Sequence, residues 1–588
     1  MHRSDLRKKN APQGRFSLAD SMPGVVGLLF LLGWLTTSHI SPWVSWHAEL
    51  PVFIAAFALA WMGILKAARH GSALVFALPP ATWPLLVMSV CALIQYLLGQ
   101  IVFIGVAFTA LLYLLIALIS ICLGATTSTF SQDVASTPAR RSQVDLWLAG
   151  TLLLVALLSV GVGLSQVLQI SNDATWILRT TDTSRAAGNV GQPNHLATLL
   201  VMAMASGVYL YSIGRVGRGV LMLSISFILL ALVATGSRSG MLGLTLLVLW
   251  WLWKQPLVTP GLPRWFGFPF AIGFVAIQLL WAKFLTAYDI VGQSGATRLV
   301  ESVADPRLTI WPQLLEAAGQ RPWLGWGIRN TAEAHATVVH AYGHSLPVTY
   351  SHNLVIDLAI WVGFPLASLT TVAALYWLWI RARTIAGPKT WFGLAVAIPL
   401  GVHSMFEFPY AYAYLLAPAM VGIGIVEGAA RTSYPVNFAV RPFAALLAVL
   451  TAGAAWSVVE YLRAEEDFHL ARFEMLRIGP EGQADNPAKL YLLTQLRAVN
   501  EAGRLQPGPG MRPEEIETLR RVADHSAWSG ARYRYAVALA LNGKASEASR
   551  QMQILQAQHG LELHDKLKRQ LDAEIAAFLQ SGGGASKE

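Results

Sequence analysis

The side chains best suited to chemistry stand in one polar stretch, 349–357, which ends the longest polar loop of the chain and opens an apolar run. Ser351 can cap the helix that this run predicts, because its hydroxyl can accept a hydrogen bond from a free backbone N–H. His352 is then expected in the first turn, where an imidazole can stay neutral near pH 7 and accept a proton. We interpret His352 as the base that takes the proton of a substrate hydroxyl. The alternative is a helix-end histidine that only hydrogen-bonds a neighbour.

Asn353 and Asp357 follow His352 on the predicted helix. Asp357 lies about 7.5 Å further along the axis, and a spacing of five residues does not place it on the face of His352. The sequence therefore does not predict a His–Asp dyad. An acidic side chain inside an apolar span is costly and is a functional hypothesis by default. Pairing with an arginine and a role in packing are the alternatives. We expect Asn353 and Asp357 to line a cavity beside His352.

A second polar turn, 185–195, stands directly before another apolar run. Two glycines and a proline make this turn tight, and Asn194 is the expected N-cap of the following helix. The free N–H groups of that helix start, with Arg185 nearby, could hold an anion. An ordinary capped turn is the alternative. The concentration of Gln192, Asn194 and His195 at a membrane boundary favours a site.

Two further places carry charged side chains next to apolar runs. The segment 236–240 joins two such runs with almost no spacer, so Arg238 is held near the membrane boundary. Arginine suits bidentate phosphate recognition, and an arginine that only snorkels to the interface is the alternative. Arg321 has a weaker case as a phosphate ligand, because loop arginines are often only solvated.

His403 and Glu407 are four residues apart and are expected to share a helix face. Two ligands make no metal site, so we expect a polar cavity lining in which Glu407 balances an arginine.

Composition defines the class of protein that must position these side chains. Of 588 residues, 54% are hydrophobic and 13% are charged, whereas a soluble domain has about 25% charged residues. A multispanning membrane protein is therefore predicted. The net charge of +10 is explained by Lys and Arg in short loops between apolar runs, so no nucleic acid partner is expected. The two cysteines form no metal motif, and there is no DxD pair, P-loop, GxSxG or HExxH. We therefore expect neither a metal nor a cofactor.

The apolar runs give the number of spans. A bilayer core of about 30 Å requires roughly 20 apolar residues per helix, and thirteen runs approach that length: 23–39, 51–67, 82–99, 101–124, 147–170, 196–213, 219–235, 240–254, 266–284, 353–380, 391–405, 411–428 and 443–461. Alternate loops are basic, which places the N-terminus in the cytoplasm and, with an odd span count, the C-terminal tail outside it. The outer segments 171–195, 236–239 and 285–352 nevertheless carry arginines. Anion binding is one reason for arginines on that side.

The predicted fold is all-α, a polytopic helical membrane protein with a soluble C-terminal domain. We expect a basic cytoplasmic N-terminus at 1–22, a membrane domain at 23–461 with an outer loop at 285–351, and an outer helical domain at 462–588. The loop is too long for a plain connector. Its middle, after Arg307, is amphipathic and could lie on the membrane surface. The piece 538–548 looks like the turn of a helix–turn–helix pair and resembles one tetratricopeptide unit, without a clear 34-residue period.

Taken together, four motifs resemble those of the O-antigen ligase/polymerase superfamily. They are 188–195, 236–240, the turn 322–327, and 351–353 with Gly363 after it. The similarity is greatest to bacterial protein O-oligosaccharyltransferases of the PglL type. It covers roughly 180–430, and the soluble C-terminal domain is similar to the one which that branch carries.

The resemblance implies transfer of a glycan from undecaprenyl pyrophosphate to Ser or Thr of an exported protein such as a pilin. Transfer would occur at the periplasmic face of the bacterial inner membrane and without a metal. By motif, His352 would activate the acceptor, and Arg238 and Arg321 would bind the donor pyrophosphate. Arg185 joins them as an expected donor ligand, and so does Arg307, on what looks like the family's periplasmic helix. Three alternatives stay open: an O-antigen ligase acting on lipid A-core, an O-antigen polymerase, and, in another class, a transporter of lipid-linked glycans.

Overall fold

The computed structural model describes residues 18–69, 74–133, 144–170, 174–179, 185–287, 306–430, 434–475 and 488–580. Most of the predicted N-terminal segment 1–22 and part of the loop 285–351 lie outside these residues. Each of the thirteen apolar runs coincides with a helix: α1 (Leu18–Leu35), α2 (Trp46–Arg69), α3 (Trp83–Leu97), α4 (Ile104–Asp133), α5 (Val144–Val167), α6 (Pro193–Ser212), α7 (Arg218–Thr235), α8 (Arg238–Val258), α9 (Phe268–Ala287), α13 (Leu354–Thr384), α14 (Pro388–His403), α15 (Ala413–Ala429) and α16 (Val440–Met475). The predicted all-helical architecture is confirmed. The described residues add one short antiparallel pair, β1 (Leu74–Leu78) with β2 (Tyr434–Phe438).

Within the described residues, ten of these helices are long and apolar enough to cross a membrane, whereas α14 and α15 are shorter, at 16 and 17 residues. The short helices α14 and α15 pack against each other and α15 packs along α4. Their backbones touch at glycines: a Cβ on Gly393 would lie 2.5 Å from the Gly422 carbonyl oxygen, and one on Gly424 would lie 2.1 Å from that of Ile121. Small residues permit such close helix approach in membranes. Protein, more than lipid, therefore surrounds these short helices.

Helix α13 is broken at Gly363, whose φ of 79° lies in the left-handed region. Its 31 residues would extend about 46 Å, well beyond a bilayer core of about 30 Å. Side chains before the break are mostly buried, whereas apolar side chains after it, such as Leu369 and Leu375, are exposed. We infer that the part after Gly363 faces lipid and that the start of α13 projects beyond it.

The turn 322–327 packs against this break. Backbone N–H groups of Trp326 and Gly327 donate to the carbonyls of Ile360 (2.7 Å) and Trp361 (3.2 Å), and the N–H of Phe364 donates to the carbonyl of Pro322 (2.8 Å). The turn thus binds backbone groups that the broken helix cannot pair internally, as an apolar environment requires. The sequence motif at 322–327 is therefore a packing element for α13.

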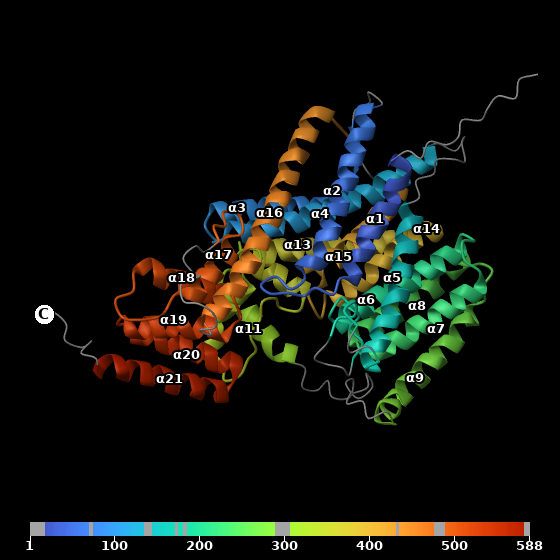
Figure 1. Ribbon diagram of the computed structural model, residues 1–588. Coiled ribbons are helices and arrows are strands. Elements are labelled where there is room, and N and C mark those ends of the chain that lie inside the picture. Colours follow the sequence, from blue (N-terminus) through green and yellow to red (C-terminus); the bar gives the residue numbers. More distant parts are fainter. Residues whose placement is uncertain are drawn as a thin grey trace, which may run out of the picture.

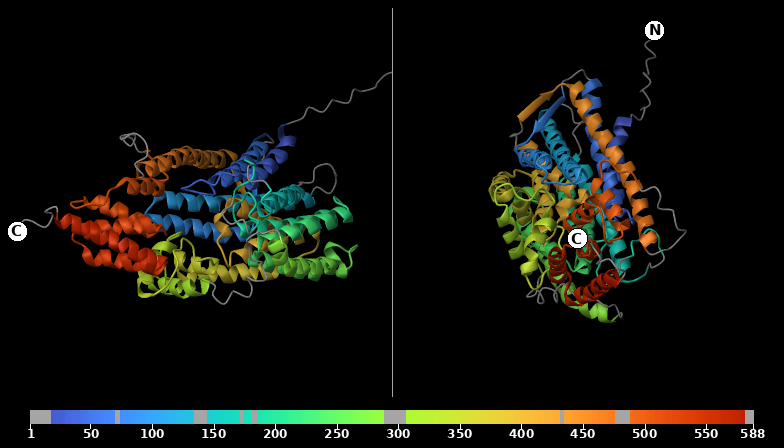
Figure 2. Two further views of the ribbon diagram at one scale, coloured as in Figure 1. Left: turned by 60° about the horizontal axis from the view of Figure 1, so that its bottom comes forward. Right: turned by 90° about the vertical axis from the view of Figure 1, so that its left-hand side faces the viewer.

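The C-terminal helices are α17 (Thr494–Arg504), α18 (Pro513–His525), α19 (Ser529–Leu541), α20 (Ala545–His559) and α21 (Leu561–Gln580), and the helix–turn–helix expected at 538–548 is the α19–α20 pair. They gather at one end of the molecule, beside α11 (Pro306–Gln320), while the helices α6–α9 lie toward the other end (Figures 1 and 2). Helix α16 runs through position 461 without a break and leads into them. The buried carboxylate of Glu460 accepts from the backbone N–H groups of Tyr491, Leu492 and Leu493. This carboxylate therefore fixes the chain before α17 to α16.

The outer loop contributes α11, α12 (Thr331–Val338) and the short 3-10 helix η5 (Val339–Ala341). Apolar side chains of α11 and α12 share one core cluster with the start of α13 and with the C-terminal helices, and Val339 of η5 packs with Ile554 and Ala557 of α20. Two polar contacts cross to α20: the N–H of Ser345 donates to the carbonyl of Ala557 (2.7 Å), and His335 lies 3.4 Å from the amide of Gln558. The C-terminal helices thus hold the loop that leads to 351–353.

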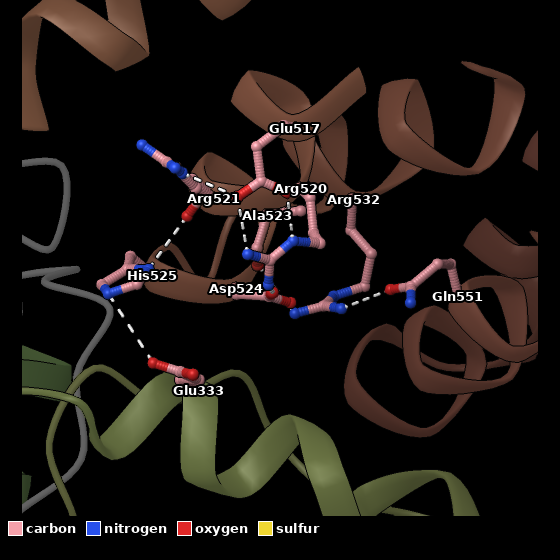
Figure 3. Close-up of polar contacts among 9 residues, drawn as sticks. All are labelled: Glu333, Glu517, Arg520, Arg521, Ala523, Asp524, His525, Arg532 and Gln551. Carbon is pink, nitrogen blue, oxygen red and sulfur yellow. Dashed lines mark hydrogen bonds and ion pairs between the residues drawn. The ribbon is translucent and has the colours of Figure 1, made fainter. Parts of the chain in front are cut away.

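A polar seam joins α12 to α18 (Figure 3). Glu333 of α12 points toward His525 of α18, with 3.7 Å between the carboxylate oxygen and Nε2. Burial, and after it the charge of Asp524, raises the pKa of Glu333 to about 7. Burial lowers the pKa of His525. Both shifts disfavour charge at this contact.

Candidate active site

His352 is the last residue but one before α13 and lies in the left-handed region, with φ of 58°. The predicted caps are wrong at this position. Asn353 is the N-cap, because its side-chain oxygen accepts from the N–H groups of Val355 and Ile356. Ser351 instead donates its hydroxyl to the carbonyl of Asn353 (2.6 Å). The left-handed turn at His352 delays the helix start, so His352 lies outside the first turn in which we expected it.

The imidazole of His352 is paired with Glu407. Nδ1 lies 2.8 Å from Oε2 of Glu407, and the other carboxylate oxygen accepts from Arg307 at 2.6 Å. Burial on its own would raise the pKa of Glu407, but the hydrogen bond from His352 and the charge of Arg307 outweigh it and leave the pKa below its usual value. Glu407 is thus an ionised bridge. We expected Glu407 to balance an arginine, and the structure identifies that arginine as Arg307.

This pairing leaves Nε2 of His352 as the ring nitrogen that a substrate can reach. The side chain is 30% exposed, whereas that of Glu407 is 13% exposed. The Phe408 ring meets the imidazole edge to face at 5.1 Å between centroids. The carboxylate and the aromatic ring together fix the orientation of the imidazole, as a base requires.

The predicted helix face shared by His403 and Glu407 is wrong, because α14 ends at His403 and Glu407 lies after it. Nδ1 of His403 lies 2.8 Å from the hydroxyl of Thr198 on α6, and the His403 ring lies 5.6 Å from that of His195. His195 in turn contacts the hydroxyl of Tyr414 at 2.9 Å. All four side chains are buried. His195 and His403 therefore pack between helices behind the site.

The turns 185–195 and 236–240, far apart in sequence, are neighbours. Arg185 joins them, because its Nε donates to the carbonyl of Thr235 (2.7 Å) and its Nη2 to Oδ1 of Asn194 (3.2 Å). Asn194 is not the N-cap of α6; the predicted cap is wrong here too. Gln192 caps α6 by accepting from the N–H of His195, since Pro193 occupies the first helical position and favours the residue before it as the cap.

Arg238 is the first residue of α8, directly after its N-cap Ser237. The guanidinium of Arg185 also lies beside Gly236, at 3.6 Å from the position of a Cβ there. Two arginines and the start of a helix therefore gather at this corner. Such an arrangement favours a phosphate, because free N–H groups and the helix dipole add to the cationic charge.

Arg321 has a different setting from the other arginines. Its guanidinium stacks over the ring of Trp326, 3.9 Å from the centroid. The backbone N–H of Trp326 donates to the carbonyl of Ile360, so Arg321 lies beside the middle of α13. It also lies close enough to Glu333 for its charge to lower the pKa of that side chain. Arg321 is thus next to the seam with the C-terminal helices.

Sequence reasoning missed Tyr410 and Thr331. Both hydroxyls donate to the buried carboxylate of Asp357. The signal for Tyr410 was the alternation of aromatic residues over 406–414, which continues directly from Glu407. Thr331 carries no comparable signal in the sequence.

Comparisons with known proteins bear on this site. Three family models match the chain: O-antigen ligase at 223–371, protein glycosylation ligase at 186–211, and the C-terminal part of virulence factor membrane-bound polymerase at 391–572. A general O-oligosaccharyltransferase of Acinetobacter baylyi is 23% identical over 547 residues, which is 91% of this chain and 92% of the relative. A ComP-specific O-oligosaccharyltransferase of the same organism is 26% identical over 327 residues, 55% of this chain and 57% of the relative.

The chain is therefore similar to the O-antigen ligase family and to protein O-oligosaccharyltransferases. The predicted resemblance and the predicted enzyme class, a glycosyltransferase, are confirmed. The glycosylation-ligase match contains the turn with Gln192 and Asn194, and the O-antigen ligase match contains Arg238 and His352. The third match contains Glu407 and most of the C-terminal helices. The three matches together thus contain Gln192, Arg238, His352 and Glu407.

Proposed function

We propose that this oligosaccharyltransferase moves a glycan from undecaprenyl pyrophosphate to a Ser or Thr hydroxyl of an exported protein such as a pilin. The observation that carries the proposal is the contact of the Glu407 side chain with both His352 and Arg307. An oriented imidazole with one free nitrogen is what activation of a hydroxyl requires. The arginine corner at 185 and 238 is suited to a pyrophosphate.

The reaction is a single displacement. Nε2 of His352 takes the proton as the acceptor oxygen attacks the anomeric carbon of the reducing-end sugar. The bond from that carbon to the pyrophosphate oxygen breaks, and its electron pair leaves with the lipid pyrophosphate. A single attack inverts the configuration at the anomeric carbon. General-base catalysis of this kind contributes about 10²–10⁴ in rate.

Charge develops on the base and on the leaving group, and each is balanced by a side chain of opposite charge. Glu407 stabilises the imidazolium that forms when His352 accepts the proton. Arg185 and Arg238 offset the charge that develops on the leaving pyrophosphate, and Arg307 and Arg321 are further candidates for this role. Preorganised donors of this type contribute about 3–4 kcal/mol each.

The periplasmic side is supported by where the loops fall. The motif residues lie at the start of α6, between α7 and α8, and at the start of α13. The opposite ends of these helices carry Arg215 and Arg218 between α6 and α7, and Arg381 and Arg383 at the end of α13. Basic loops face the cytoplasm. The site and the C-terminal helices would then face the periplasm from the inner membrane.

The decisive experiment is transfer by the purified enzyme with a His352→Ala variant. We expect folded protein that binds the donor lipid and transfers no glycan. His564→Ala is the matched control, since His564 lies on α21, among the C-terminal helices, and pairs with Asp565 next to it. Near-normal transfer by His352→Ala would remove the base assignment. Offering both a pilin and a lipid A-core acceptor tests the acceptor class, because glycan on the lipid alone would make the enzyme an O-antigen ligase.

A further inference from the structure

Asp357 is fully buried one turn into α13 and does not reach the cavity in which the sequence placed it. Its Oδ1 accepts from the backbone N–H of Ser351 (3.0 Å) and from the hydroxyl of Thr331 (2.9 Å). Its Oδ2 accepts from the hydroxyl of Tyr410. One carboxylate therefore joins three segments: the end of the outer loop, the start of α12, and the segment after α14.

Two of these segments carry the proposed catalytic pair. Ser351 directly precedes His352, and Tyr410 follows Glu407 by three residues. The positions of the imidazole and of its carboxylate partner are thus both tied to Asp357, although Asp357 lies five residues along the chain from His352. A displacement of either segment would change the 2.8 Å contact between Nδ1 and Glu407.

The backbone at His352 needs such support. Its φ of 58° is in the left-handed region, which residues with a side chain seldom adopt. Conformations of this kind persist only where surrounding contacts hold them. The contacts on Ser351 are of that type: its N–H is bound by Asp357, and its carbonyl accepts from Nε1 of Trp311 at 2.9 Å.

We propose that Asp357 is a positioning residue for glycan transfer, whose buried carboxylate fixes His352 and Glu407 relative to each other. It touches no substrate and acts through the His352–Glu407 contact, so the proposal rests on the proposed function of His352. Replacing a residue that is needed only for folding would lower the stability of the protein. Replacing a positioning residue lowers kcat in folded protein, and this effect disappears in a variant that already lacks the contact which the residue maintains.

The test compares Asp357→Asn, Glu407→Gln and the double variant in purified enzyme. Asparagine keeps the shape but turns one acceptor into a donor that faces a hydroxyl or an N–H. We expect Asp357→Asn to lower kcat about 10-fold or more, the loss for a disturbed hydrogen bond to a charged group, with KM for donor and acceptor unchanged. The double variant should be no slower than Glu407→Gln alone, since both changes disturb one contact.

The matched control is Glu427→Gln. Glu427 is also a fully buried carboxylate, held by Nε1 of Trp377 (2.8 Å) and by Arg381 (2.5 Å) at the far end of α13. Its variant should lower the thermal unfolding midpoint and leave kcat unchanged. An unchanged kcat in folded Asp357→Asn, or losses that multiply with those of Glu407→Gln, would overturn the positioning role.

If Asp357→Asn does not fold, Tyr410→Phe decides by the same two criteria, because it removes one hydrogen bond and keeps the ring. Failure of this proposal is distinct from failure of the proposed function. Transfer by His352→Ala would refute the base assignment itself. An inactive His352→Ala beside a fully active Asp357→Asn would refute only the role of Asp357.

Discussion

Glu407→Gln is the perturbation that tests the site most directly. Glutamine keeps the length and shape of the side chain but offers one oxygen and one NH₂ group in place of two acceptors. Either His352 or Arg307 then loses its partner, since the two side chains occupy opposite carboxylate oxygens at 2.8 and 2.6 Å. The imidazolium formed during the reaction also loses a compensating charge.

The expected loss follows from these contacts. A hydrogen bond to a charged group contributes about 1.5–3 kcal/mol, and each 1.36 kcal/mol corresponds to about tenfold in rate. We therefore expect kcat to fall about 10- to 100-fold, with little change in KM. Because the pKa of Glu407 is lowered, its carboxylate is ionised above its ordinary pKa of about 4.5, and its contribution is lost only as pH falls through the lowered value. Protonation of Glu407 should therefore not limit wild-type transfer above about pH 5.

The assay is steady-state transfer of a lipid-linked oligosaccharide to a pilin by purified enzyme, with kcat and KM measured separately. A matched control exists in the same chain. Glu465 pairs with Nε2 of His47 at 3.0 Å, with side-chain exposure close to that of the Glu407 pair. Glu465→Gln should leave kcat unchanged. Equal kcat values for wild type and Glu407→Gln, or equal losses in the two variants, would refute the reasoning.

Three further outcomes follow from the geometry. Arg185→Lys replaces a planar guanidinium, whose Nε and Nη2 donate to two separate acceptors, by a compact ammonium without that fixed geometry. KM for the donor should therefore rise about 10-fold with kcat little changed; an unchanged donor KM would refute a role of this corner in pyrophosphate binding. Gly363→Ala would place a Cβ 2.5 Å from the backbone of Trp323 at a φ of 79°, whereas a Cβ on Gly401 meets nothing within 4 Å. We expect only the first to lower stability, by about 3 kcal/mol or more in thermal unfolding. Burial lowers the pKa of His335 to about 4, so its stabilising effect is complete above about pH 6.5 and is lost as pH falls toward 4. The hydrogen-exchange protection factors of α20, which correct for the intrinsic pH dependence of exchange, should therefore fall over that range, and in His335→Gln they should not.

The apolar runs predicted the helices correctly because burial in lipid or protein selects for uninterrupted apolar sequence whatever the partners are. They did not predict whether lipid or protein surrounds each helix. Helix α13 has the composition of one long span, yet its first part is covered by the outer loop and the C-terminal helices. The boundary expected at 461 falls inside α16 for the same reason, since a helix can continue from lipid into a folded domain.

The two N-caps show how far local rules extend. Ser351 and Asn194 are of residue types that often cap helices, but the N-cap of α13 is Asn353 and that of α6 is Gln192. A cap depends on the backbone conformation of a single residue. Next to His352, the backbone of Ser351 is bound by Asp357 and by Trp311, which comes from α11.

The sequence by itself determined which side chains are available: a histidine at a helix boundary, and arginines and acids next to apolar runs. These follow from residue type and from the partition between lipid and water. Only the tertiary structure decided the pairs. Arg307 meets Glu407 across 100 residues and Arg185 meets Thr235 across 50. Such contacts depend on how α6, α8, α13 and α14 pack, and packing is a property of complementary surfaces that no local pattern encodes.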